Sequence, residues 1–198
     1  NLSCPHASGY GMAMGQDPDM VREIVAAVFA AVDVPVIPKL TPNVDDIAVI
    51  GRAACEGGAA ALCAINTAGP GYTESHGHPV LSNGMGGMSG KGVLPLTLKA
   101  LSALRAATDL PLIGCGGLSS AADCRAAAGC GATIFGIGSG LTGMDTGAVA
   151  RYFSTIARDM NSYTDEAGQL VRYDVDMNFK PYRVVANEVV CEDITVVT

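Results

Sequence analysis

The chain has 198 residues, a size that corresponds to one globular domain or to one domain with part of another. Its 49% hydrophobic and 16% charged residues exclude an intrinsically disordered protein. Twelve basic and 19 acidic residues give a net charge of −7, so the basic surface of a nucleic-acid-binding protein is absent. No apolar run has the roughly 20 residues of a membrane span, and no secretory pattern opens the chain, so we expect a cytoplasmic protein without membrane association.

The seven cysteines are scattered and form no C-x-x-C pair. This distribution argues against a disulfide framework and against a structural metal site, and we expect no bound metal. His76 and His78 have no third ligand near them in sequence, which favours a solvated loop. The chain begins at Asn1 and ends at Thr198 within an apolar alternation, so we expect it to be a segment of a longer protein.

Strand and helix signals alternate along most of the chain. Strands are predicted to end near Cys4 and to cover residues 34–40, 61–65, 110–114 and 132–137, where short apolar, often β-branched runs occur. Each is followed by a segment with helical spacing, and the helices are predicted to begin near Asp17-Pro18, Val44, Pro95 and Ser120 and to include residues 149–160. Five strands that each precede a helix predict a parallel α/β fold.

Two stretches depart from this alternation. Residues 67–94 form a long glycine-rich connection, which in a domain of this size is typical of a functional loop. From Asn161 the composition becomes more polar, and residues 182–185 and 193–197 predict antiparallel β-structure. We therefore place a boundary near Asp176, with one domain over residues 1–175 and the beginning of a β-rich domain over residues 176–198.

The placement of glycines favours a barrel over an open sheet. Gly116-Gly117 and Gly138-Ser139 directly follow two consecutive predicted strands. In a (β/α)8 barrel the loops after the last two strands form a phosphate site, in which backbone N–H groups hold the anion. No G-x-G-x-x-G follows a predicted strand, which disfavours a Rossmann fold. We predict the C-terminal portion of a (β/α)8 barrel, with about five strands, followed by the start of an antiparallel β domain.

Polar, charged and nucleophilic side chains gather at the predicted strand ends. Asn1, Asn66 and Thr67 offer neutral donors and acceptors suited to a small polar ring, although Asn66 and Thr67 could equally cap a turn. Lys39 supplies a cation within an apolar segment, where an unpaired charge would be costly. Cys4 could be a base or nucleophile, or an inert buried thiol. Together with the glycine pairs, these residues predict a phosphorylated cofactor beside a polar heterocycle.

Several motifs, in order, resemble the class 1 dihydroorotate dehydrogenases over residues 1 to about 160. The motifs are Asn1-Leu2-Ser3-Cys4-Pro5, Pro38-Lys39-Leu40-Thr41-Pro42-Asn43-Val44, Ile65-Asn66-Thr67, Pro79-Val80-Leu81-Ser82-Asn83, Gly86-Gly87-Met88-Ser89-Gly90, Gly116-Gly117 and Gly138-Ser139. The resemblance implies the second half of an FMN-binding barrel. Its implied reaction is the oxidation of dihydroorotate to orotate in the biosynthesis of UMP.

The resemblance also implies roles for individual residues. Cys4 matches the base that removes the C5 proton of dihydroorotate while the C6 hydride passes to FMN, and Asn1, Asn66 and Thr67 match residues that hold the pyrimidine ring. The positions that match FMN contacts are Asn1, Lys39, Ile65, Gly90, Gly116, Gly117, Gly138 and Ser139.

The same resemblance implies a partner for electron transfer. Residues 182–198 are similar to the opening of the electron-transfer subunit of the NAD-linked subclass. FAD and an iron–sulfur cluster are then expected only in that further portion or partner, and an oligomer is expected.

Two alternatives stay open at this point. His6, within Asn-Leu-Ser-Cys-Pro-His, resembles dihydropyrimidine dehydrogenase, which reduces uracil and thymine on a similar barrel. A non-catalytic phosphate-binding barrel is the second alternative.

Overall fold

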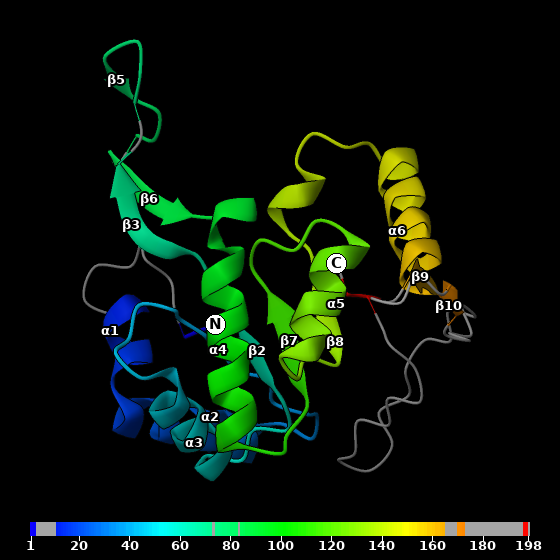
Figure 1. The fold of residues 1–198 in the computed structure, drawn as a ribbon. Coiled ribbons are helices and arrows are strands. Elements are labelled where there is room, and N and C mark those ends of the chain that lie inside the picture. Colours follow the sequence, from blue (N-terminus) through cyan, green and yellow to red (C-terminus); the bar gives the residue numbers. More distant parts are fainter. Residues whose placement is uncertain (3–10, 73, 83, 165–169, 173–195, 198) are drawn as a thin grey trace.

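A five-stranded parallel sheet forms the centre of the computed structural model, which describes residues 1–2, 11–72, 74–82, 84–164, 170–172 and 196–197. The strand order is β1-β2-β7-β8-β11, and each neighbouring pair is parallel (Figure 1). These strands are Lys39–Leu40 (β1), Leu62–Ala64 (β2), Leu112–Cys115 (β7), Ile134–Gly136 (β8) and Val196–Val197 (β11). The predicted parallel α/β fold is thereby confirmed. Leu2 donates its N–H to the Lys39 carbonyl, so the residue predicted to lie in an earlier strand does contact β1.

Helices connect the strands, and four of the six described helices begin at a capping side chain. Their bounds are Gly11–Gln16 (α1), Pro18–Ala31 (α2), Ile47–Glu56 (α3), Leu94–Ala107 (α4), Ala121–Gly129 (α5) and Thr146–Met160 (α6). Asp17, Asp46, Ser120 and Asp145 each accept a hydrogen bond from a backbone N–H in the first turn, as a good N-cap does. The short helix α1 has no counterpart among the predicted elements.

Side chains alternate between a helix-covered face and an open face of the sheet. Leu40, Ala64 and Phe135 are buried at matching register positions, and Gly114 in the same row packs against Leu101 of α4 and Ala127 of α5. Lys39, Cys63 and Cys115 alternate with them, point to the other face, and are only half buried. The hydrophobic core therefore lies between the sheet and its helices.

The strand predicted over residues 34–40 is much shorter in the structure. Val34 lies in a bend and residues 35–38 have no regular secondary structure. The carbonyls of Val36 and Pro38 accept hydrogen bonds from the backbone N–H groups of Ala60 and Cys63, but only Lys39–Leu40 forms a regular strand. Pro35 and Pro38 have no N–H and cannot complete a ladder. Val34 and Ile37 are also exposed, so this run is less buried than expected.

The long connection over residues 67–94, predicted to be a functional loop, contains several short strands. It contains Ala68–Tyr72 (β3), Glu74–Ser75 (β4), His78–Pro79 (β5), Met85–Met88 (β6) and a 3-10 turn at Lys91–Val93 (η1). β3 pairs antiparallel with β6, and β4 with β5, to make a ribbon that projects from the domain (Figure 1). His76 and His78 are exposed near its tip.

The C-terminal residues that the structure describes divide between two arrangements. Ser162–Thr164 (β9) and Leu170–Arg172 (β10) pair antiparallel, whereas β11 pairs parallel with β8. For Val196 and Val197 the expectation of antiparallel structure is therefore wrong, because they extend the parallel sheet. Residues 182–185 and the boundary near Asp176 lie outside the described residues. No helix among the described residues is long and apolar enough to cross a membrane.

Gly57, directly after α3, lies so close to α2 that a side chain has no room there. A β-carbon at this position would lie 2.7 Å from the Arg22 carbonyl oxygen of α2 and 2.8 Å from the Val25 β-carbon. We expect Gly57→Ala to lower the free energy of unfolding by about 1–3 kcal/mol, the usual cost of overpacking. Urea denaturation monitored by circular dichroism measures this change.

The matched control is Gly129→Ala at the end of α5. A β-carbon there meets nothing within 4 Å, so we expect unchanged or slightly increased stability. Equal midpoints for the Gly57 variant and the parent protein would contradict the close α2–α3 packing.

Candidate active site

The carboxyl ends of four parallel strands bring the predicted site residues to one edge of the sheet. β1, β2, β7 and β8 run side by side in the same direction. The residues at or just after their carboxyl ends are Lys39, Ile65, Asn66, Thr67, Gly116, Gly117, Gly138 and Ser139. In parallel α/β folds ligands bind at this edge. The sheet topology therefore places these residues at one edge of the sheet.

Asn1 and Asn66 are in direct contact, 65 positions apart in sequence. The Asn66 side-chain amide donates to the Asn1 carboxamide oxygen at 2.9 Å, and the Asn66 backbone N–H donates to the Leu40 carbonyl at 2.9 Å. The Asn66 carboxamide oxygen in turn accepts from the backbone N–H of Thr67 at 2.7 Å. The three residues predicted to hold a polar ring thus form one hydrogen-bonded group above β1 and β2.

Thr67 carries a buried hydroxyl whose hydrogen-bonding capacity is unused. Its Oγ1 atom has no hydrogen-bond partner in the described part of the chain. The β6 backbone passes close by, since a β-carbon on Gly87 would lie 2.0 Å from that oxygen. Buried polar groups are almost always satisfied, so this hydroxyl is suited to a ligand.

Lys39, Cys63 and Cys115 form a charged cluster on the open face of the sheet. The hydrogen bond from the Cys63 thiol and the charge and hydrogen bond of Lys39 together outweigh burial and lower the pKa of Cys115 to about 6. The same Cys63–Cys115 hydrogen bond, with burial, raises the pKa of Cys63. These interactions favour the ionised form of Cys115, with Cys63 as the protonated partner.

Gly116 and Gly117 make a tight turn that only glycine can form. Their φ angles are +110° and +77°, in the region that side chains disfavour. A β-carbon on Gly117 would lie 2.6 Å from the Leu94 nitrogen and 3.0 Å from the Gly90 carbonyl oxygen, and one on Gly116 would lie 2.9 Å from the Ile65 side chain. The fold therefore packs Ile65, Gly90, Gly116 and Gly117 together.

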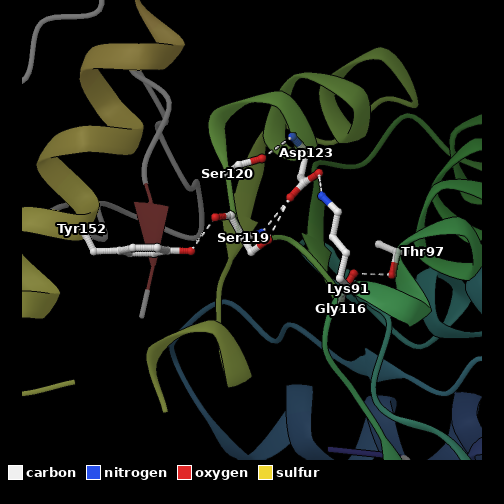
Figure 2. A network of polar contacts seen from close by, with 7 residues as sticks. All are labelled: Lys91, Thr97, Gly116, Ser119, Ser120, Asp123 and Tyr152. Atoms are coloured by element: carbon white, nitrogen blue, oxygen red, sulfur yellow. Dashed lines mark hydrogen bonds and ion pairs between the residues drawn. The ribbon is translucent and has the colours of Figure 1, made fainter. Parts of the chain in front are cut away.

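Asp123 ties this glycine turn to the segment around Gly90, as Figure 2 shows. Its buried carboxylate accepts hydrogen bonds from the Lys91 ammonium and from the backbone and hydroxyl of Ser119. Burial by itself raises the pKa of Asp123, but these hydrogen bonds, with that of Ser120, outweigh burial and lower it. The Asp123–Lys91 ion pair thus joins α5 to η1 across the turn.

Two further hydroxyl groups hold the same turn in place (Figure 2). Thr97 of α4 donates to the Gly116 carbonyl at 2.7 Å, and Tyr152 of α6 donates to the Ser119 carbonyl at 2.8 Å. Three helices therefore fix the loop after β7.

Gly138 and Ser139 follow β8, next to the loop that holds Gly116 and Gly117. Ser139–Leu141 forms a 3-10 turn (η2), and both Gly138 and Ser139 are exposed. A β-carbon on Gly138 would meet nothing within 4 Å, so space remains above this backbone. A β-carbon on Gly140 would lie 3.8 Å from the Leu118 carbonyl oxygen, so η2 packs beside the loop after β7.

Cys4, the predicted base, lies outside the described residues. The sequence interpretation missed Cys63, Cys115, Lys91, Thr97 and Asp123. Asp123 had a usable signal, because it stands three residues after the capping Ser120 in the turn after a Gly-Gly pair. The two cysteines had none, since their proximity depends on the pairing of β2 with β7.

Comparisons with known proteins identify the family of the chain. The family described as "Dihydroorotate dehydrogenase" matches residues 1–160. The catalytic subunit of dihydroorotate dehydrogenase B (NAD(+)) from Methanocella arvoryzae is 46% identical over 166 residues, which are 83% of this chain and 54% of that protein. The same-named subunit from Pyrococcus horikoshii is 51% identical over 121 residues, covering 61% of this chain and 40% of that protein.

A solved structure shows the same fold at low sequence identity. The crystal structure of DHODH in complex with ferulenol from Eimeria tenella matches with a TM-score of 0.65 and 19% identity, over 81% of this chain and 48% of that one. The chain spans about half the length of the curated relatives it matches. With most of its length matched by one family, the chain belongs to the dihydroorotate dehydrogenase family.

Proposed function

We propose that this chain supplies part of the active site of an FMN-dependent oxidoreductase that converts dihydroorotate to orotate in pyrimidine biosynthesis. The observation that carries this proposal is the gathering of Asn1, Lys39, Asn66 and Gly116-Gly117 at one edge of a parallel sheet. The 46% identical relative, named as the catalytic subunit of dihydroorotate dehydrogenase B (NAD(+)), supports it. In this proposal the sheet is the C-terminal portion of a (β/α)8 barrel.

The residues at this edge fit FMN. A β-carbon on Gly138 would meet nothing within 4 Å, so the exposed backbone at Gly138 and Ser139 leaves room for a phosphate, which backbone N–H groups can bind in a chain of net negative charge. Ile65 and Gly90 pack against the positive-φ turn at Gly116-Gly117 and complete the cofactor contacts that we propose, together with Asn1 and Lys39. When bound, FMN supplies an acceptor for the hydride that leaves C6 of dihydroorotate.

The neutral side chains at the ends of β1 and β2 are assigned to the substrate. Asn1 and Asn66 present amide groups, and Thr67 presents a buried hydroxyl that has no hydrogen-bond partner among the described residues; these groups suit the carbonyl and N–H groups of a pyrimidine ring. Cys4 is proposed as the base that removes the C5 proton. Lys39 places a positive charge at the same edge, where it can stabilise negative charge on a bound ring.

The two relatives are named as catalytic subunits, and a catalytic subunit belongs to an assembly with at least one other subunit. We propose that this other subunit, or a further portion of the same protein, transfers electrons. We assign FAD and an iron–sulfur cluster to that partner or to a further portion of the protein, and residues 176–198 to the beginning of such a β-rich domain. A cytoplasmic location and an oligomeric assembly belong to the same proposal.

Anaerobic flavin bleaching tests the proposed reaction directly. The purified protein should carry FMN, and the visible absorbance of the oxidised flavin should be lost on addition of dihydroorotate but not of dihydrouracil. Bleaching by dihydrouracil alone would indicate a dihydropyrimidine dehydrogenase activity instead. Bound FMN that neither compound reduces would indicate a non-catalytic barrel, and protein that binds no flavin would contradict the proposal.

Replacing Cys4, the proposed base, should slow proton removal from dihydroorotate without changing the binding of FMN. We expect Cys4→Ala to slow anaerobic flavin reduction by dihydroorotate by about 10²–10⁴-fold, the usual contribution of a general base. FMN content and melting temperature should stay unchanged. Cys55→Ala on α3 is the matched control and should reduce flavin at the parent rate. An unchanged rate in the Cys4 variant would exclude Cys4 as the base.

Weakening the Asp123–Lys91 ion pair beside the Gly116-Gly117 turn should weaken the binding of FMN. Asp123→Asn keeps the side-chain shape but weakens the Lys91 contact, and we expect FMN to bind about tenfold more weakly, measured by quenching of flavin fluorescence. Asp46→Asn is the control, because asparagine caps α3 as well as aspartate does.

At low pH the parent protein and the Asp123→Asn variant should bind FMN with equal affinity. The folded-state pKa of Asp123 is depressed, so its contribution is present above the unfolded value of about 3.9 and is lost as pH falls through the lower folded value. The affinity difference should therefore be constant between pH 5 and 8. Equal FMN affinity in the two proteins at pH 7 would contradict a role for the ion pair in shaping the site.

A further inference from the structure

The turn that follows β1 belongs to a sequence motif in which the proposed function uses only Lys39. Thr41 in this turn is fully buried, and its hydroxyl oxygen accepts a hydrogen bond from the Asn43 backbone N–H at 3.1 Å. Threonine side chains commonly fix a turn by such a contact with the backbone two residues further on. The contact therefore fixes the shape of the turn and the position of Asn43, which is half buried.

On one side the turn contacts α1. The Gln16 side-chain amide donates a hydrogen bond to the Asn43 carbonyl oxygen at 2.6 Å. The same helix packs against the beginning of the chain, since a β-carbon on Gly15 would lie 2.0 Å from the Leu2 carbonyl oxygen. Leu2 directly follows Asn1, which is proposed to bind the pyrimidine ring. Helix α1 therefore connects the turn to the chain beside a proposed substrate residue.

On the other side the Asn43 side chain contacts the beginning of β3. Its carboxamide oxygen accepts a hydrogen bond from the Gly69 backbone N–H at 3.0 Å, across 26 positions of sequence. Gly69 has a φ of +108° and lies where the β3–β6 register shifts, between Ala68 and Gly71. A glycine has little conformational preference of its own. The hydrogen bond to Asn43 therefore restrains the backbone at the point where the β3–β6 ladder is irregular.

Gly69 is two residues beyond Thr67, whose buried hydroxyl is assigned to the substrate. Asn66 hydrogen bonds both to the Thr67 backbone N–H and to the Asn1 side chain. The ring-binding group thus comes from two segments of the chain, one with Asn1 and one with Asn66 and Thr67. Asn43 lies between them, because its carbonyl contacts α1 and its carboxamide contacts β3.

We propose that Asn43 is a positioning residue for substrate binding, which holds Gly69 so that Asn66 and Thr67 keep a fixed place relative to Asn1. This inference rests on the proposed function, because it concerns the geometry of the proposed pyrimidine site. Asn43 acts through the backbone of β3. Its removal should weaken ring binding equally in the ground state and the transition state, which raises the half-saturating substrate concentration and leaves the limiting rate unchanged.

The dependence of flavin reduction on dihydroorotate concentration tests this role in the full-length, FMN-loaded protein under anaerobic conditions. Asn43→Ala removes the acceptor, and we expect the half-saturating concentration to rise about tenfold, as for the loss of one hydrogen bond. The limiting rate should stay within about twofold of the parent rate. Asn43→Asp keeps an oxygen acceptor and should restore the half-saturating concentration to within about twofold. An unchanged concentration in Asn43→Ala, or no recovery in Asn43→Asp, would overturn the proposal.

Asp46→Ala is the matched control, because it removes the same kind of contact a few residues further along the chain. The Asp46 carboxylate accepts a hydrogen bond from the Ala48 backbone N–H at 2.8 Å, and this bond caps α3. Its loss should lower the melting temperature without changing the half-saturating concentration. Equal increases of that concentration in Asp46→Ala and Asn43→Ala would indicate a general loss of stability and refute a positioning role.

Amide hydrogen exchange separates this inference from the proposed function. Exchange of the Gly69 N–H should be faster in Asn43→Ala than in the parent protein and near the parent rate in Asn43→Asp, whatever reaction the protein catalyses. Unchanged exchange in Asn43→Ala would refute the restraint on β3. Faster exchange with an unchanged half-saturating concentration would limit Asn43 to a structural role and overturn the proposal. A parent protein whose flavin dihydroorotate does not reduce would instead overturn the proposed function, and the substrate role of Asn43 with it.

Discussion

The parallel alignment of four short strands, with one face packed against helices, is the constraint on which the site depends. Leu40, Ala64 and Phe135 are buried toward the helices at successive register positions, and burial of these apolar side chains holds the strands in that register. The alternation then leaves Lys39, Cys63 and Cys115 on the opposite face. A one-residue slip of β1 would bury the lysine in the core. The core register and the placement of polar groups at the site therefore have the same cause.

The loops at the carboxyl edge are held in place by polar contacts more than by apolar packing. Asp123 joins α5 to Lys91, Thr97 joins α4 to Gly116, and Tyr152 joins α6 to Ser119 (Figure 2). Such buried, charge-assisted networks fix one geometry because an unpaired member is costly. A loop built on glycines with positive φ has little conformational preference of its own. Its shape comes from the three helices around it, which suits a rigid cradle for a phosphate.

Lys39 and Cys115 compensate each other's charge at the carboxyl edge of the sheet. The hydrogen bond from Cys63 and the charge of Lys39 lower the pKa of Cys115, which favours a negative charge beside the ammonium. The ammonium is then desolvated at lower cost, because its counterion lies within the same face of the sheet. The chain has a net charge of −7, so local pairing of this kind, with backbone N–H groups, is how it can accommodate an anionic ligand.

The sequence by itself determined the alternation of strands and helices, the capped helix starts, the glycine turns and the family, because these depend on local patterns of residues. It also predicted that Asn1, Lys39, Asn66 and Gly116 meet, since parallel strands share one carboxyl edge. Only the tertiary structure decided which side chains touch. The Asn1–Asn66 contact, the Cys63–Cys115 pair and the Asp123–Lys91 ion pair join residues from different elements. Their proximity follows from strand register and helix packing, and no spacing along the chain encodes those distances.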